Sequence, residues 1–369
     1  MDLAARRARE GAEVLLLDGG SEAPLSRAGV PCRQPAVSPE AAAAVDGAVR
    51  TWARVWGRLP LRDGRSFREL AEWKGVSLWW MGEGFFREST EAPRCVRAVE
   101  SFLRLLEAEA PAEVEAGGLL PAEALLLSRA CTARGVLYHG PAAARPRVPP
   151  GAWASRGRRE AWGAWLDGFR SGGPEPPGDV PLVVDEEDAA LAPVAAALGS
   201  RVIALPAVVR AASRPARNAA REGRRRLLGL FGLLRASPGV HESFSHRGVP
   251  FFDLAEGDLA GLLLARLPAA VRLYEAAREW LAAARPRAVL VAVRSRDDRR
   301  AFFAAATAAG VPSIQLRPGE GDEADRADGG PHPGQVLTGE AALDPERVEA
   351  GLRAAGAGTA AARGSFGGP

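Results

Sequence analysis

PRAVLVAVRSRDDRRAFFAAATAAGVPSIQ, residues 286–315, is the stretch that decides the fold. A proline precedes the apolar run AVLVAV, which is typical of a strand buried on both faces of a parallel sheet. An alanine-rich helix follows, and Gly310-Val311 leads into a second candidate strand. Strands that alternate with helices in this way predict a parallel sheet with crossover helices, and therefore an α/β fold.

The same order of elements occurs earlier in the chain. Pro111 and Gly135 bracket a strand, a loop and a helix at the same spacing as Pro286 and Gly310. After Gly135, as after Gly310, a valine opens the next candidate strand. A rhythm common to all α/β chains would explain the order of elements, whereas the equal spacing favours internal duplication.

A further pair of matching segments lies upstream of each such unit. EWKGVSLWWMGEG at 72–84 aligns with SHRGVPFFDLAEG at 245–257, with Gly-Val and Glu-Gly at one constant offset. Residues 2–17 and 187–205 each read as a helix, a glycine and a strand. We therefore expect two Rossmann-like parallel-sheet domains that are related by duplication.

The predicted division of the chain follows from this repeat. The first Rossmann-like domain spans 1–145 and lacks a counterpart of the strand at 182–184 with which the second begins. A linker rich in Pro, Gly and Arg covers 146–180, and the second domain covers 181–340. A short helix and a flexible tail are predicted for 341–369.

Composition excludes several classes of protein. The chain has 369 residues and a formal net charge of +3, so it lacks the basic excess typical of nucleic-acid binding. Cys32, Cys95 and Cys131 lie far apart, which argues against a disulfide framework or zinc site and favours a reducing cytoplasm. No apolar run is long enough to cross a membrane. We expect a soluble bacterial protein, cytoplasmic or peripheral on the inner membrane, with no resident metal.

Ligands in open parallel sheets bind beyond the carboxyl ends of the strands, and the residues that follow two predicted strands fit such a site. They are Gly117 and Gly118 in the first half, and Arg294, Ser295 and Arg296 in the second. Free backbone N–H groups and guanidinium groups there would bind phosphate. An ordinary tight turn between strand and helix accounts for the same residues.

His139 and Glu83 are the candidate catalytic residues. His139 ends the last predicted strand of the first half, where it would contact a ligand or move a proton, or would be a structural or exposed residue. Glu83 has Glu256 as its counterpart in the repeat. Each carboxylate would act as a general base, or would stabilise the N-terminus of a helix beginning at Gly84 or Gly257.

Residues 210–234 form a predicted helix with arginines on one face, ahead of the apolar run LLGLFGLL. A helix that docks on anionic lipid has this pattern, and so does a solvated basic face over a packed apolar one. RNA binding fits less well, because the face lacks interleaved aromatic residues. The arginines are Arg214, Arg217, Arg221, Arg224 and Arg225.

The pattern of helix, proline, strand, helix and GVPSIQ at 286–315 resembles the N-terminal domain of GT-B-fold glycosyltransferases of bacterial surface-polysaccharide biosynthesis. WKGVSLWW and RGVPFFDLAEGDL also look like segments of those enzymes. In that family the pattern typically ends in Gln-His-Gly. Tyr138-His139-Gly140 comes close to it, whereas Gln315-Leu316-Arg317 has lost the histidine.

The resemblance implies a nucleotide-sugar donor and transfer of the sugar to a polysaccharide or lipid-linked acceptor in a cleft between the domains. It implies that His139 contacts the acceptor or acts as base, that Glu83 assists, and that Gly117, Gly118 and residues 294–296 face phosphates. The chain after Glu340 is too short for a further Rossmann domain. We therefore expect the second half to serve as partner domain, or the chain to be a truncated or degenerate relative. A degenerate relative would be a non-catalytic binding or scaffold module, membrane-associated through the arginine helix.

Overall fold

The computed structural model describes residues 39–140, 212–292 and 297–317. Shorter described stretches are 14–15, 32–33, 181–183, 192–199, 201–202, 205–210, 335–338, 344, 346–351 and 353–354. The predicted linker at 146–180 lies outside the described residues, as do Arg294, Ser295 and Arg296. In the C-terminal segment, the predicted short helix is present where it is described, at 346–351 and 353–354.

The described residues divide into two compact units, and neither unit is continuous in sequence. Unit 1 takes in the described residues of Met1–Val55, Glu91–Arg147 and Phe244–Ala255, and unit 2 those of Trp56–Thr90, Val148–Ser243 and Glu256–Pro369. Each unit therefore combines segments from both halves of the predicted repeat. The division differs from one made in chain order at 145 and 181.

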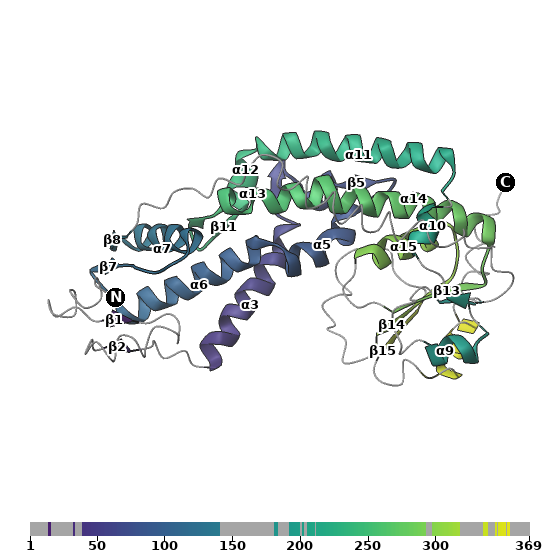
Figure 1. Cartoon of the computed structure of the whole chain (residues 1–369), viewed down its shortest axis with the longest axis horizontal. Helices are drawn as coiled ribbons and strands as arrows, with labels where there is room; N and C mark the ends of the chain where they lie inside the picture. Colours follow the sequence, from purple (N-terminus) through teal and green to yellow (C-terminus); the bar gives the residue numbers. More distant parts are fainter. Residues whose placement is uncertain are drawn as a thin grey trace. The chain divides into compact units, whose positions relative to one another are not determined.

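Unit 2 contains a five-stranded parallel sheet in the order β10-β9-β13-β14-β15 (Figure 1). The strands are β9 (Pro181–Val183), β10 (Arg201–Val202), β13 (Ala288–Ala292), β14 (Ser313–Arg317) and β15 (Gln335–Thr338). Val289, Leu290 and Ile314 are fully buried, as predicted for strands covered on both faces. Numbered along the chain, the order is 2-1-3-4-5, which is a doubly wound arrangement. The predicted α/β class is confirmed.

The described strands of unit 1 form short parallel and antiparallel pairs. β1 (Val14–Leu15) pairs with β2 (Cys32–Arg33), and β7 (Glu113–Glu115) pairs with β8 (Leu137–His139), both in parallel. The described residues do not join these two pairs into one sheet. A complete Rossmann-like domain in the first half therefore stays a prediction.

Three short antiparallel hairpins each carry a two-residue turn in which both residues have positive φ. The turns are Asp63-Gly64 (φ 51° and 73°), Lys74-Gly75 (50° and 80°) and Arg247-Gly248 (48° and 85°). The hairpins are β3 (Pro60–Arg62) with β4 (Arg65–Ser66), β5 (Glu72–Trp73) with β6 (Val76–Ser77), and β11 (Ser245–His246) with β12 (Val249–Pro250). Glycine at the second turn position suits this geometry, which matches the twist of the strands. The repeated Gly-Val is therefore the end of a hairpin turn.

The helices after these hairpins begin earlier than the sequence suggested. α5 (Leu78–Ser89) and α13 (Phe252–Gly261) start directly after β6 and β12. The predicted helix starts at Gly84 and Gly257 are therefore wrong. In both places the hairpin ends two residues after the glycine of its turn, and the helix begins at the next residue or the one after. Glu83 and Glu256 lie inside their helices and stabilise no N-terminus.

The ends of the other helices follow local chemistry. α7 (Pro121–Arg134) begins at a proline and ends at Gly135, and α14 (Leu267–Ala284) ends directly before Pro286. In α11 (Arg214–Arg235), the hydroxyl of Ser213 accepts a hydrogen bond from the backbone N–H of Ala216 at 3.3 Å. The remaining helical segments are α3 (Pro39–Trp56), α4 (Phe67–Leu70), α6 (Glu91–Glu109), α9 (Ala192–Ala197), α10 (Leu205–Arg210), α12 (Pro238–Ser243), the π-helical segment Leu262–Arg266 and α15 (Asp297–Ala308).

Aromatic side chains form part of the core of unit 2. Trp56 is fully buried, with its ring centroid 4.6 Å from Phe86 and 5.3 Å from both Phe67 and Trp79. Its indole N–H donates to the hydroxyl of Ser243 at 3.1 Å. Trp79, which is 2% exposed, is therefore a core residue.

Candidate functional site

The strand order of unit 2 creates a switch point between β9 and β13. β9 lies between β10 and β13, and its chain continues through α9 to β10 on one side. The chain from β13 continues through α15 to β14 on the other side. Ligands bind in the crevice at such points, outside the carboxyl ends of the two strands. Arg294, Ser295 and Arg296 follow β13 directly in sequence and lie outside the described residues.

α15, the helix that follows these residues in sequence, is joined to α5 by a buried ion pair. The Nη1 atom of Arg300 lies 3.6 Å from Oε2 of Glu83, and both side chains are only 7% exposed. The same nitrogen donates to the carbonyl of Trp80 at 2.8 Å. The guanidinium carbon also lies 5.6 Å from the centre of the Trp80 ring, within the range of a cation–π contact. Glu83 thus compensates a buried arginine and ties α15 to α5.

Gly117 and Gly118 are exposed and lie between β7 and α7. Gly118 has a φ of 77°, so the loop requires glycine there for its backbone conformation. The backbone N–H of Leu120, at the start of α7, donates to the Glu123 carboxylate at 3.0 Å. A carboxylate already occupies the end of the helix where a phosphate would bind. This turn therefore fits an anion poorly.

His139 ends β8 and is half exposed. Its Nε2 atom lies 3.3 Å from Oε2 of Glu113 on the neighbouring strand β7. A carboxylate in this place orients the imidazole ring. His139 belongs to unit 1 and Glu83 to unit 2, so the two candidate catalytic residues lie in separate units. Nearby Cys131 is buried, which raises the pKa of its thiol and makes it a poor nucleophile.

Two buried glutamates were missed in the sequence. In unit 2, Glu275 of α14 is 2% exposed and its Oε1 atom accepts from the indole N–H of Trp73 at 2.7 Å. The same oxygen lies 2.7 Å from the ammonium group of Lys74, and Arg278 contacts the other oxygen at 3.2 Å. The Lys74-Gly75 turn thus brings a second cation to this buried carboxylate, beside Arg278 of the same helix.

Unit 1 has the corresponding arrangement around Glu100 of α6. This carboxylate is 3% exposed; its Oε2 atom lies 2.8 Å from Nε2 of His246, and its Oε1 accepts from Arg104 at 2.7 Å. Arg247 contacts it at 3.5 Å. Burial acts to raise the pKa of Glu100, but the hydrogen bonds from His246 and Arg104 and the charge of Arg247 outweigh it. The pKa therefore lies below its ordinary value.

The two glutamates occupy matching positions, and each is contacted by the hairpin of the other half. Glu100 and Glu275 stand at equal distances before Pro111 and Pro286. The hairpin with Lys74, from the first half, packs on α14 of the second half in unit 2. The hairpin with Arg247, from the second half, packs on α6 of the first half in unit 1. The two halves therefore exchange hairpins, and the signal available in the sequence was an acid at the same place in each long helix.

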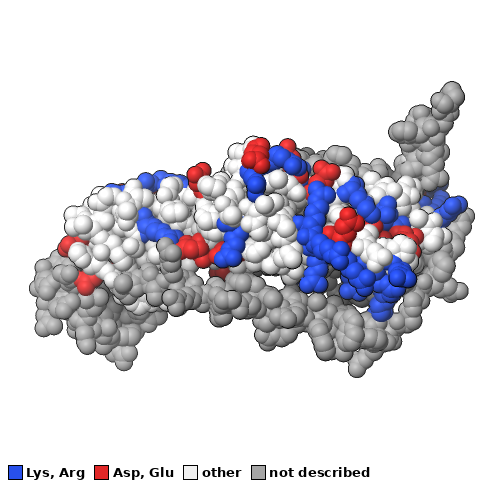
Figure 2. All heavy atoms as spheres, turned by 90° about the horizontal axis from the view of Figure 1, so that it is seen from above, with Lys and Arg blue, Asp and Glu red and all other residues white. Residues whose placement is uncertain are grey.

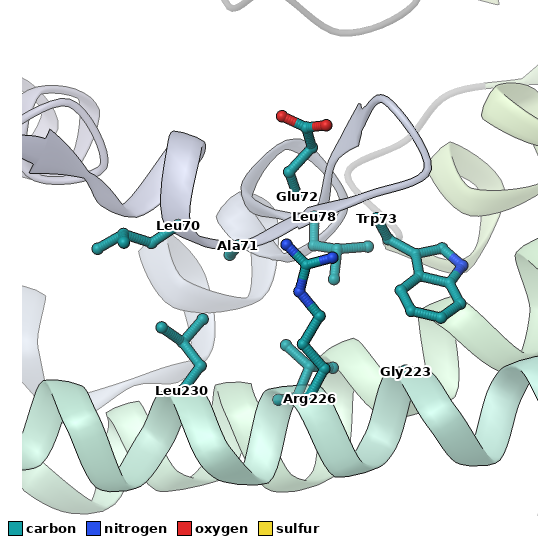
Figure 3. A pocket seen from close by; sticks show the side chains of 9 residues that line it. Leu70, Ala71, Glu72, Trp73, Leu78, Gly223, Arg226 and Leu230 are labelled. Carbon is teal, nitrogen blue, oxygen red and sulfur yellow. The ribbon is translucent and has the colours of Figure 1, made fainter.

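A small hollow lies where the β5–β6 hairpin and the residues beside it meet α11 within unit 2 (Figure 3). Its volume is about 10 Å³, which is room for about one water molecule. Apolar side chains from residues 70–78 and from α11 line it, with Arg226 and Glu72 beside them. α11 comes close to α14 at Gly223, where an added Cβ would lie 2.6 Å from Val271. The hollow is too small for a nucleotide or a sugar.

The described part of the chain contains no group of three or more His, Cys, Asp or Glu side chains placed to hold a metal ion. Among the same residues, no helix is both long and apolar enough to cross a membrane. Comparisons with protein-family models, with curated proteins and with solved structures found no match for this chain.

Proposed function

We propose that the chain is a GT-B-like glycosyltransferase that binds a nucleotide-sugar donor at the switch point between β9 and β13. The observation that carries the proposal is the strand order 2-1-3-4-5, because open α/β sheets bind ligands outside the carboxyl ends of the strands at such a switch point. Arg294 and Arg296 follow that strand in sequence and supply guanidinium groups for a diphosphate. The chain after β9 continues Asp185-Glu186, whose carboxylates suit ribose hydroxyls.

The likeness of the two halves supports internal duplication. α7 and α15 both lead to a left-handed glycine, Gly135 at 69° and Gly310 at 67°. The next residues, Val136 and Val311, both donate back into their helix at 2.9 Å. Two such halves agree with a GT-B-like plan in which the first serves the acceptor and the second the donor.

In this proposal the residues of the site have distinct roles. Arg294 and Arg296 bind the phosphates, whereas Glu83 is a positioning residue that holds α15 through Arg300. His139, oriented by Glu113, accepts the proton of the acceptor hydroxyl as the sugar is transferred. The nucleoside diphosphate is the leaving group.

The proposal is tested by calorimetric titration of the full chain with UDP-, GDP- and CMP-sugars. We expect one nucleotide class to bind, and Arg294→Ala with Arg296→Ala to weaken that binding by at least about 10-fold, the effect of one lost charged hydrogen bond. Arg94→Ala with Arg97→Ala removes two exposed arginines from α6 and should leave binding unchanged. Absence of binding by every nucleotide-sugar would overturn the proposal.

The alternative is a non-catalytic binding module, and His139 separates it from an enzyme. Release of nucleotide diphosphate in the presence of a polysaccharide or lipid-linked acceptor is measured for the unchanged chain and for His139→Ala. In an enzyme, His139→Ala lowers the rate by about 10²-fold or more and leaves donor binding intact. Donor binding without any release from the unchanged chain would favour the binding module.

A further inference from the structure

The exposed face of α11 carries both arginines and leucines. Packing against the rest of unit 2 does not account for these side chains, because they point away from the buried stripe of the helix. The helix buries one stripe, and its predicted basic face is confirmed as exposed. Figure 2, which views the molecule from above Figure 1, shows basic side chains gathered on the side where α11 lies. The buried stripe is Ala216, Gly223, Leu227, Leu230 and Leu234, and the five predicted arginines, all exposed, are Arg214, Arg217, Arg221, Arg224 and Arg225.

The positions of these arginines cost helix stability. Cations are unfavourable near the positive N-terminal end of a helix, and Arg214 and Arg217 lie in its first turn. Like charges three or four residues apart repel each other, as Arg217 does with Arg221, and Arg221 with both Arg224 and Arg225. No carboxylate in the described part of the chain forms an ion pair with any of them, and Arg221 donates only to the amide oxygen of Asn218 at 3.1 Å. A pattern that opposes helix formation locally indicates a function for the charges.

Apolar side chains follow the arginines on the exposed surface of the same helix. Leu228 is 58% exposed and Leu233 is 50% exposed. The apolar run LLGLFGLL therefore divides, with some leucines in the core and others facing outward. Gly229 and Gly232 lie between the exposed leucines, and an added Cβ at either would meet no atom within 4 Å.

We infer that α11 docks on an anionic lipid surface, with its arginines on the headgroup phosphates and Leu228 and Leu233 entering the acyl boundary. A basic helix with exposed leucines binds such an interface by combining electrostatic attraction with apolar burial. A nucleic acid would use the charges alone, and the exposed residues of α11 include no aromatic side chain for base stacking. The docking face uses none of the residues assigned to nucleotide binding.

The first test is co-sedimentation of the full chain with vesicles of phosphatidylcholine, alone or mixed with phosphatidylglycerol. We expect binding only to the mixed vesicles, weakening as salt is raised. Arg217→Gln with Arg221→Gln should weaken it about 30-fold, the effect of two basic residues near an anionic surface. Arg94→Gln with Arg97→Gln is the matched control, because those arginines already pair with Glu91 and Asp46. Binding that survives loss of the α11 arginines, or no binding to the mixed vesicles, would overturn the inference.

The second test is a gain of binding. Gly229→Leu with Gly232→Leu adds apolar side chains in open space on the docking face, so vesicle binding should rise by at least about 10-fold. Gly47→Leu makes the same kind of change in open space on α3, which carries none of the docking residues, and should leave binding unchanged. No gain from the α11 leucines would show that the face does not enter lipid. Salt-sensitive binding to a DNA or RNA strand with no vesicle binding would identify a nucleic acid as the partner instead.

Discussion

The unit β7–α7–β8 of the first half and the unit β13–α15–β14 of the second are alike in local structure and opposite in burial. Both helices end in a left-handed glycine, and Gly135 and Gly310 donate to carbonyls three residues back at 3.2 and 3.1 Å. In β13 the central Leu290 is fully buried, whereas Leu137 of β8 is 64% exposed. β13 has neighbours on both sides, while β7 pairs only with β8 among the described strands. Local sequence thus shapes the turn, and the neighbouring strands decide the burial.

The largest expected effect tests that difference in burial. Leu290→Ala removes a fully buried side chain and should lower the free energy of unfolding by about 2–5 kcal/mol. Leu137→Ala makes the same chemical change on an exposed strand and should change it by no more than about 0.5 kcal/mol. Urea denaturation measures both. Similar losses in the two variants would show that β8 is covered as β13 is.

The next effect concerns the hairpin contact in unit 1 and its pH dependence. Glu100 has a pKa below the ordinary 4.5, so it adds stability above that pH which is lost as pH falls towards its folded pKa. Glu100→Gln should cost about 1–3 kcal/mol at neutral pH, because it weakens hydrogen bonds to His246 and Arg104. The difference between variant and unchanged chain should shrink in acid.

Urea denaturation at neutral pH and at pH values below 4.5 checks this narrowing. Glu91→Gln alters a half-exposed acid on the same helix and serves as the control. A loss from Glu100→Gln that stays constant across the pH range would contradict the role given to its charge.

The smallest expected effect concerns Gly135 and Gly310, the left-handed glycines at which the two halves have the same local structure. Gly135→Ala and Gly310→Ala each force a residue with a Cβ into a left-handed conformation, at a cost of about 1–2 kcal/mol. The two losses should agree within about 0.5 kcal/mol, the usual error of additivity between distant sites. Thermal unfolding and urea denaturation both measure the loss of stability in the two variants. Unequal losses would mean that tertiary contacts act on one of the turns.

Much of the fold could be predicted from patterns within short stretches. The strand at β13, the helix ends at Gly135 and Gly310, and the basic face of α11 all depend on residues close in sequence. The hairpins were missed, although Asp63-Gly64 is a turn sequence of the expected kind and the other two turns also have glycine at their second position. In the candidate site, the sequence pointed to residues 294–296 and His139. It did not reveal that Glu83 pairs with Arg300, since those residues are brought together only by the packing of α5 on α15.

The sequence by itself determined the α/β class, the matched spacing of the two halves and the arginines along one helix face. These features depend on periodicity, glycine and proline, which act over a few residues. Only the tertiary structure decided that the halves exchange hairpins, because Trp73 meets Glu275 across 202 residues and His246 meets Glu100 across 146. A two-residue turn sets the shape of a hairpin. The helix on which the hairpin packs depends on a buried carboxylate, Glu275 or Glu100, that needs hydrogen-bond donors and positive charge around it. No pattern of neighbouring residues in the sequence predicts that pairing.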